Sequence, residues 1–138
     1  MELSDGQERF IKRMRLGHLA TADRVGEPHV VPVCFVYLAG CFYIPIDEKP
    51  KRTLRLKRLR NIEVNPRAAL LLDEYSEDWS QLGWLLVRGR ATISEVGAEH
   101  AAVLAALRAK YPQYREMALQ GRPLIQVWPE KVSAWGKV

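Results

Sequence analysis

The sequence predicts one mainly β domain with a few helices (α+β), an antiparallel barrel, closed or split, with helices at its rims. The chain has 138 residues, of which 48% are hydrophobic and 27% charged, and this suits a single domain with one core. Runs of β-branched and aromatic residues recur along the chain between turn residues, and they account for about six to seven strands. No repeat or linker interrupts residues 1–138, so we expect one domain.

An amphipathic helix is predicted at the start of the chain. Ser4 and Gln7 fit a capping box, and apolar residues then recur at helical spacing until Gly17. The helix is therefore expected over residues 5–16, with its apolar face covering one end of the barrel.

Three strands are predicted next. The first begins at His18, residues 24–28 form a turn, and residues 29–38 are a long run of β-branched and aromatic residues. A two-residue hairpin at Ala39 and Gly40 then leads into residues 41–46. Strands in such close succession favour an antiparallel meander.

The second half of the chain repeats this alternation. Strands are expected over residues 67–75 and 82–93, and a helix rich in Ala and Leu over about residues 97–110. The C-terminal segment PLIQVWPEKVSAWG is predicted to form two short strands broken at Pro129.

The two cysteines, Cys34 and Cys41, are expected to be free thiols. They would lie out of register on the hairpin, and neither belongs to a CxxC pair or a histidine cluster, so no metal site is predicted. The N-terminus lacks the apolar run of a signal peptide, and no long apolar segment is present. We therefore expect a soluble cytoplasmic protein without membrane contact.

The positive charge of the chain is concentrated in one segment. Residues 49–60, KPKRTLRLKRLR, hold seven Lys or Arg and no acid, whereas the net charge of the whole chain is +5, so the remainder carries −2. Nucleic acid is an alternative ligand for such a patch. The sequence has no RNP-like, KH-type or helix-turn-helix signature, although Phe42 and Tyr43 leave a stacking platform open. We expect no nucleic-acid partner.

A helix over residues 51–61 would place Lys51, Arg55 and Arg58 on one stripe. Its start, with Lys51 and Arg52, would offer backbone N–H groups and positive charge to a phosphate. The alternative is an ordinary solvated basic helix.

Several other side chains are candidates for function. Trp79 lies in the acidic loop SEDWSQ, where a ligand or a second subunit is needed to cover a large apolar side chain. The acids of DEYSEDW are expected to pair with the basic helix, either within the chain or across a dimer, and they lack the spacing of a hard-cation loop. Arg88 and Arg90 either line a groove or pair with this loop. GxSxG, GxGxxG and Walker A motifs are absent from the sequence, which argues against a hydrolytic triad and the common nucleotide folds.

Three segments together resemble a known family: GHLATADRVGEPHVVPVCFVYLAGCFYI, DEKPKRTLRLKRLRNIEVNPRAALLLDEYSEDW and GWLLVRGRA. The most diagnostic parts are LATAD, the P-x-x-x-P-V-x-F pattern from Pro28 to Phe35, and the KPK stretch leading to NI-x-x-NP. The chain resembles the pyridoxamine 5′-phosphate oxidase-like, FMN-binding split β-barrels over residues 8–135, and within them the oxidoreductases that use coenzyme F420. It is shorter than pyridoxamine phosphate oxidase and lacks its C-terminal arginine-histidine motif, so that oxidase reaction is not implied.

The resemblance implies a homodimer with two cofactor sites in grooves between the subunits. It implies that the cofactor ring lies along two strands, that cations hold its phosphate and anionic tail, and that tryptophans lie in or near the groove, where the second subunit can contribute them. The implied cofactor-binding residues are Val31, Pro32, Val33, Tyr43, Ile44, Pro45, Lys49, Lys51, Arg52, Arg55, Arg58, Trp79 and Trp84.

The function implied by this resemblance is hydride transfer between F420 and an unidentified small molecule. The cofactor carries out that chemistry, so the absence of a catalytic triad is no objection. Tyr43, Tyr75 and solvent are candidate proton donors. F420 is favoured over FMN because FMN carries one phosphate and would leave part of the basic patch unused. An FMN-dependent oxidase or reductase and a non-catalytic flavin- or haem-binding module remain alternatives.

Overall fold

The computed structural model of the chain describes residues 2–47 and 56–138. No helix in these ranges is long and apolar enough to cross a bilayer. The elements in chain order are α1 (Asp5–Arg13), β1 (Gly17–Ala22), β2 (Pro28–Val33), β3 (Val36–Leu38), β4 (Cys41–Pro45), α2 (Lys57–Val64), β5 (Arg67–Glu74), η1 (Trp79–Gln81), β6 (Gly83–Glu95), η2 (Ala98–His100), α3 (Ala101–Lys110), η3 (Pro112–Arg115) and β7 (Pro123–Gly136).

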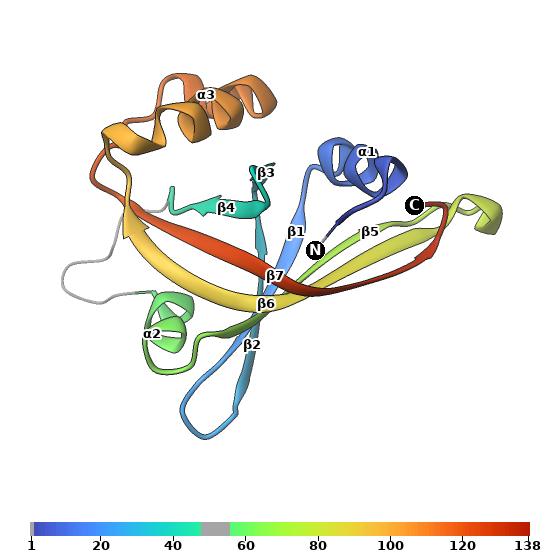
Figure 1. Cartoon of the computed structure of the whole chain (residues 1–138), viewed down its shortest axis with the longest axis horizontal. Helices are drawn as coiled ribbons and strands as arrows, with labels where there is room; N and C mark the ends of the chain where they lie inside the picture. Colours follow the sequence, from blue (N-terminus) through green and yellow to red (C-terminus); the bar gives the residue numbers. More distant parts are fainter. Residues whose placement is uncertain (1, 48–55) are drawn as a thin grey trace.

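One antiparallel sheet of seven strands forms the body of the protein, in the order β2-β1-β5-β6-β7-β4-β3. β2 and β3 stand at opposite ends of this order, yet only Cys34 and Phe35 separate them in the chain. The sheet must therefore curl until its two ends approach each other at this corner, as Figure 1 shows. The result is a split barrel whose edges are joined by the chain, and not a closed ladder.

The expected meander of the first three strands is wrong. The continuous strand expected over residues 29–38 is interrupted at Cys34 and Phe35, so that β2 pairs with β1 while β3 pairs with β4. β4 then pairs with β7 near the other end of the chain. The hairpin turn itself is confirmed, because Ala39 and Gly40 both have positive φ angles, 51° and 81°.

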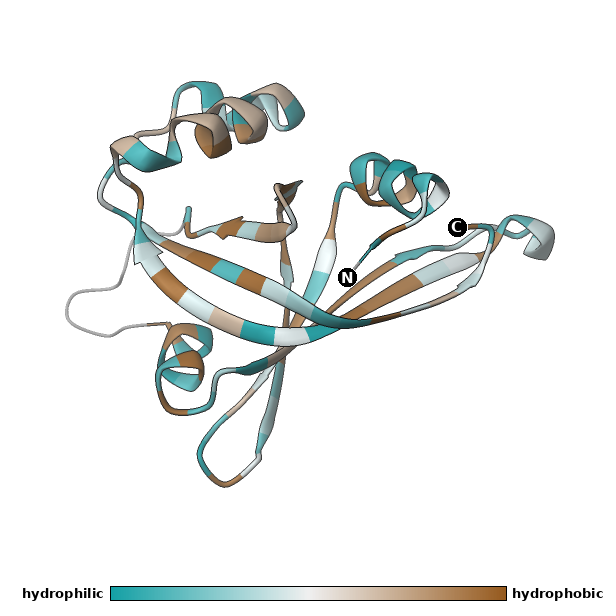
Figure 2. Cartoon of the chain, in the orientation of Figure 1, coloured by the Kyte–Doolittle hydropathy of each residue, from teal (hydrophilic) through white to brown (hydrophobic). Residues whose placement is uncertain are grey.

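The larger core cluster fills the inside of the curled sheet. Strands β1, β5 and β6 alternate between buried and outward-facing residues, and the buried set meets the apolar faces of α1 and α2. Figure 2 shows the brown, hydrophobic segments along the strands and helices. Representative members are Phe10, Leu19, Phe42, Leu59, Ile62, Leu70 and Val87.

The N-terminal helix forms as predicted but ends earlier. The Ser4 hydroxyl accepts from the backbone N–H of Gln7, and the Gln7 side chain accepts from the backbone N–H of Ser4, which completes the capping box. The helix stops at Arg13, where Met14 turns to an extended conformation and enters the core.

A second core cluster lies between α3 and the β3–β4 hairpin. Leu104 and Leu107 of α3 pack with Val36 and with Leu124 of β7. The predicted helix over residues 97–110 is present, with one 3₁₀ turn at its start. α3 therefore covers the side of the barrel opposite α2 (Figure 1).

The C-terminal segment is one strand and not two. β7 runs through Pro129 because a register shift between Arg88 and Gly89 of β6 absorbs the irregularity. Gly89 has no side chain at the point where the backbone of Trp128 comes close. Both cysteines are free thiols, as predicted.

Candidate functional site

Helix α2 begins within the basic segment, and its start carries positive charge only. Its first turn holds Lys57, Arg58 and Arg60 and no acid, and Leu56 at the N-cap provides no side-chain hydrogen bond. The N-terminus of a helix already carries partial positive charge, so cations there are unfavourable unless an anion binds. The helix lies over residues 57–64, which places its described part further along the chain than the predicted 51–61.

A hollow of about 260 Å³ separates α2 from the turn between β1 and β2. Arg24, Lys57 and Arg60 line it together with one acid, Asp23. The Asp23 carboxylate accepts the backbone N–H of Glu27 and lies 3.9 Å from the Lys57 ammonium. The Glu27 hydrogen bond is the main reason that the pKa of Asp23 is lowered. The hollow keeps an excess of positive charge.

The inner side of α2 fixes the helix against β1. Asn61, which is buried, donates to the Thr21 hydroxyl at 3.1 Å, and the Asn65 amide donates to the backbone oxygen of Asp23 at 3.3 Å. The apolar side chains of Leu59 and Ile62 on this helix are buried in the larger core cluster. Arg58 is also buried, with 9% exposure, so it approaches the sheet and not the solvent.

The predicted ring-binding residues lie on two strands that are not neighbours. Pro32 is exposed on β2, Val31 is half-buried, and Val33 points into the core. β2 is an edge strand, so alternate backbone groups along its free side have no partner in the sheet. A planar ligand held mainly by backbone contacts fits this strand.

The β4 residues are less accessible. Ile44 and Pro45 are buried, while Tyr43 is half-buried against the second core cluster. Burial, and secondarily Cys41, raises the pKa of Tyr43. The structure therefore does not bring the side chains of β4 and β2 onto one exposed surface.

The outward side of the sheet, which we call the outer face, carries an exposed apolar area. One row of this face crosses four neighbouring strands. From β2 through β1 and β5 to β6, the residues that stand opposite one another are Pro32, His18, Leu71 and Leu86. Val30 in the next row is 61% exposed. Toward the far end, Trp84 stands opposite Trp135, which is 54% exposed. Several partly exposed apolar residues grouped on one face of a sheet in this way are typical of an interaction surface.

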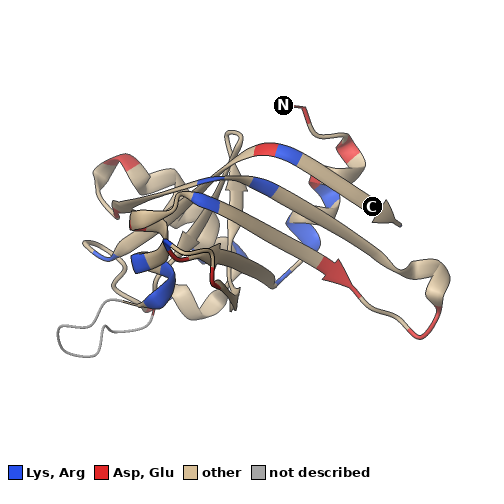
Figure 3. Ribbon diagram, turned by 90° about the horizontal axis from the view of Figure 1, so that it is seen from below, with Lys and Arg blue, Asp and Glu red and all other residues tan. Residues whose placement is uncertain are grey.

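Beside this apolar area lies a basic cluster formed by Arg67, Arg88, Arg90 and Lys131. Arg67 stands opposite Arg90, and Arg88 stands opposite Lys131, and Figure 3 shows the corresponding blue segments on adjacent strands. Like charges directly opposite each other are destabilising. Within the described residues, the only ion pair of the cluster joins Arg67 to Glu130 at 3.7 Å. Arg88 and Arg90 thus lie exposed on the outer face, and among the described residues neither forms an ion pair with the acidic loop.

Arg67 and Lys131 could not be identified from the sequence as members of this cluster. Alternation along each strand could identify which residues point outward, but only the register between strands brings the four cations together.

The acidic loop does not reach α2. Arg67 at the start of β5 lies next to α2, whereas Trp79 follows the end of β5, about 23 Å away along the strand at 3.3 Å per residue. Glu74 pairs with Arg13 of α1 at 2.7 Å, so the expected pairing with the basic helix is not seen for it. Trp79 is 71% exposed. In one chain it cannot reach a ligand held by α2.

The two candidate proton donors lie far apart. Tyr43 stands opposite Gln126 on β7. Tyr75 follows Glu74, which stands opposite Gly83 of β6, and Gly83 in turn stands opposite Gly136 of β7. Gln126 and Gly136 are ten residues apart on β7. This corresponds to about 30 Å along the strand. Tyr75 is 65% exposed. A single site within one chain cannot use both. Lys49, Lys51, Arg52 and Arg55 lie outside the described residues.

Comparison with known proteins gives a family and a fold. The sequence pattern of the family described as pyridoxamine 5′-phosphate oxidase matches residues 3–136. A search of curated proteins found no significant match. The solved structure of HutZ, the haem storage protein of Vibrio cholerae, is similar with a TM-score of 0.73 and 21% identity, covering 99% of this chain and 96% of that one.

Two further solved structures have the same fold. A conserved hypothetical protein of Mycobacterium tuberculosis has a TM-score of 0.77 and 19% identity, covering 99% of this chain and 87% of that one. An FAD-binding protein of Mesorhizobium loti has a TM-score of 0.68 and 22% identity, covering 96% and 92%.

Proposed function

The chain belongs to the pyridoxamine 5′-phosphate oxidase family, and we propose that it binds a phosphate-bearing flavin or deazaflavin between the edge strand β2 and the start of α2. The observation that carries this proposal is the first turn of α2, which has cations, no acid and no side-chain cap. Lys57 and Arg60 would hold the phosphate, and the exposed Pro32 side of β2 would support the ring.

Among such cofactors we propose coenzyme F420, used for hydride transfer to a small electrophilic molecule. The cofactor supplies the hydride chemistry when bound. The chain would orient the ring, exclude water and neutralise negative charge. The basic cluster supports F420 over FMN, because Arg67, Arg88, Arg90 and Lys131 provide a second cationic surface for an anionic tail.

A second copy of the chain would complete the site. On the outer face Val30 is exposed and Leu71 and Leu86 are half-buried, and such a surface is stabilised by packing against another apolar surface. Trp79, too distant from α2 in its own chain, could then approach the cofactor bound by the partner. The homodimer is therefore part of the proposal.

Haem binding is the second candidate function. His18 points outward from β1, and its Nδ1 atom lies 3.7 Å from the Asp73 carboxylate. A carboxylate beside one ring nitrogen orients a histidine so that the other nitrogen can bind a metal. This pair lies on the outer face beside Leu71, where an apolar macrocycle would be covered by a second subunit.

Parallel titrations of the purified protein with oxidised F420, FMN and haemin test these functions. Cofactor fluorescence reports the first two ligands, and the Soret band reports haem. We expect F420 to bind with micromolar or lower Kd. The double variant Lys57→Gln/Arg60→Gln should weaken binding by about 10- to 100-fold, as expected for lost hydrogen bonds to a charged group.

The matched control removes two cations from another helix, as Arg9→Gln/Lys12→Gln on α1. If both double variants weakened cofactor binding equally, the weakening would come from the loss of net positive charge. That result would contradict a phosphate site at α2. Preference for FMN would identify the flavin branch. Haem binding that His18→Ala abolishes, without binding of either flavin, would replace the proposal by the second candidate.

A further inference from the structure

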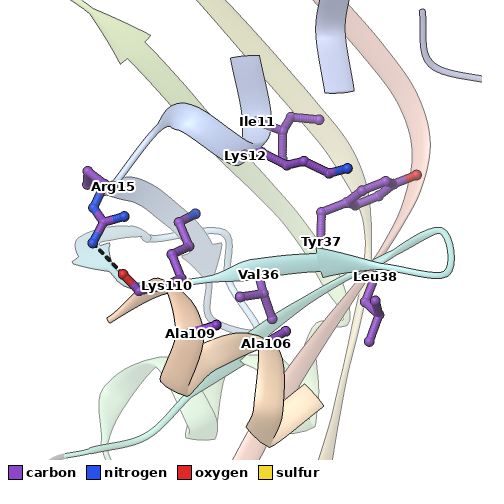
Figure 4. Close-up of a pocket in the computed structure, with 9 residues that line it drawn as sticks. All are labelled: Ile11, Lys12, Arg15, Val36, Tyr37, Leu38, Ala106, Ala109 and Lys110. Atoms are coloured by element: carbon purple, nitrogen blue, oxygen red, sulfur yellow. Dashed lines mark hydrogen bonds between the residues drawn. The ribbon is translucent and has the colours of Figure 1, made fainter. Parts of the chain in front are cut away.

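A pocket of about 460 Å³ lies between α1, β3 and α3 (Figure 4). Figure 1 shows these three elements on the side of the barrel away from α2. The pocket involves none of the residues assigned above to the cofactor. Its volume falls within the range of small-molecule sites.

The lining of the pocket is mainly apolar. Val36, Tyr37 and Leu38 form one wall along β3, and Ala106 and Ala109 of α3 form the side facing them. The two alanines leave space that larger side chains would fill. The β3 wall is continuous with the core, because Val36 is buried and Tyr37 packs against Phe42.

The polar groups of the pocket are all cationic. Its nine lining residues include Lys12, Arg15 and Lys110 and no acid. Figure 4 shows Arg15 and Lys110 at one side of the opening and Lys12 at the other. The Arg15 guanidinium donates a hydrogen bond to the backbone oxygen of Lys110. This bond holds Arg15 and Lys110 close together.

Lys110 is placed in an environment that favours an anion. Its ammonium donates to the backbone oxygen of Phe35 at 3.1 Å and lies 3.8 Å from the centre of the Phe35 ring. Burial, and secondarily the Arg15 charge, lowers the pKa of Lys110 to about 8. No carboxylate of the pocket lining compensates this charge. An anionic ligand would do so.

We propose that this pocket binds a small carboxylate with an apolar body, such as a medium-chain acyl carboxylate. The acyl part would lie against Val36, Leu38 and Ala106, and the carboxylate would lie near Lys110, Arg15 and Lys12. This shape and charge complementarity excludes cationic ligands and disfavours neutral ones. The ligand differs in chemistry and in location from the phosphate-bearing cofactor proposed above.

Calorimetric titration with sodium decanoate tests the proposal, with 1-decanol and decyltrimethylammonium as neutral and cationic analogues. We expect saturable binding of one decanoate per chain, binding of decanol weaker by about tenfold or more, and no binding of the cation. Equal affinity for decanoate and decanol, or absence of decanoate binding, would overturn it.

Two variant pairs locate the site. Ala106→Phe should abolish decanoate binding by filling the pocket, whereas Ala105→Phe, exposed on the same helix outside the pocket, should leave it unchanged. Lys12→Glu should weaken binding by about tenfold, and Arg9→Glu on the same helix should change it by less than about twofold. Thermal melting confirms that each variant is folded. Unchanged affinity in Ala106→Phe and Lys12→Glu would show that decanoate binds elsewhere.

Discussion

The Tyr111 hydroxyl satisfies both backbone groups of Phe35, at the corner where the two ends of the sheet meet. It accepts from the Phe35 N–H at 3.1 Å and lies 3.1 Å from the Phe35 carbonyl oxygen, with the Arg15 carbonyl oxygen at 3.0 Å as a second acceptor for its hydrogen. Phe35 is fully buried, so water cannot replace these contacts. Burial also raises the pKa of Tyr111 to about 12, which keeps the hydroxyl protonated.

Tyr111→Phe should therefore destabilise the protein markedly. The loss leaves a buried N–H without a partner, which costs about 1 to 3 kcal/mol of unfolding free energy. Urea denaturation measures it. Tyr75→Phe is the control, because Tyr75 is exposed and its hydroxyl lies 3.5 Å from Glu77 only. Equal stability of both variants would contradict a structural role of the corner.

Lys110 should make stability depend on pH. Its pKa is lowered to about 8 from 10.5, so between these values the unfolded chain binds more protons than the folded one. The unfolding free energy must then rise with pH across this window, while below pH 8 the amine is charged in both states.

Lys110→Met removes this dependence. Subtracting the unfolding free energies of the variant from those of wild type, at pH 7 and pH 10, isolates the contribution of Lys110. We expect the difference to change by about 1 to 2 kcal/mol in favour of wild type at the higher pH, after allowance for solvent screening. Parallel pH profiles of the two proteins would contradict the lowered pKa.

Gly89 allows β6 and β7 to stay paired across the register shift. A Cβ atom at this position would overlap the backbone oxygen of Trp128, and backbone atoms of Pro129 lie 3.2 Å away. Gly89→Ala should therefore lower the unfolding free energy by about 3 kcal/mol. Gly121→Ala, whose Cβ meets nothing within 4 Å, should cost only about 1 kcal/mol through its positive φ. Thermal and urea unfolding of the two variants test the contrast.

Local patterns predicted most elements correctly. The Ser4–Gln7 capping box, the Ala39–Gly40 turn and the strands β5 and β6 each depend on neighbouring residues, and each is found in the structure. The pairing of β4 with β7 could not be predicted in this way. It joins Tyr43 to Gln126, and no local signal specifies which distant strand completes a sheet.

The site was predicted only in part for the same reason. The basic segment suggested an anion site, and the described start of α2 is cationic, but Arg58 proved to be buried. The basic cluster depends on the register that places Arg67 opposite Arg90. A shift of either strand by one residue would move one of these side chains to the core side.

The outer face should hold two copies of the chain together, and Leu86 tests this directly. Leu86 lies between Leu71 and Ser133 on neighbouring strands, with its side chain half-exposed in the centre of the apolar area. Leu86→Lys would place a charge there. Desolvation of an unpaired ammonium then opposes association. We expect wild type to sediment as a dimer and Leu86→Lys as a monomer with unchanged circular dichroism.

Ala102→Lys, exposed on α3, adds the same charge elsewhere and should remain dimeric. A monomeric wild type, or a dimeric Leu86→Lys, would show that the outer face is not the interface. Cofactor titration of the monomeric variant adds a second result. Because Trp79 cannot reach α2 within its own chain, a site completed by the partner must lose affinity when the dimer dissociates. Unchanged affinity in the monomer would mean that β2 and α2 of one chain are sufficient to bind the cofactor.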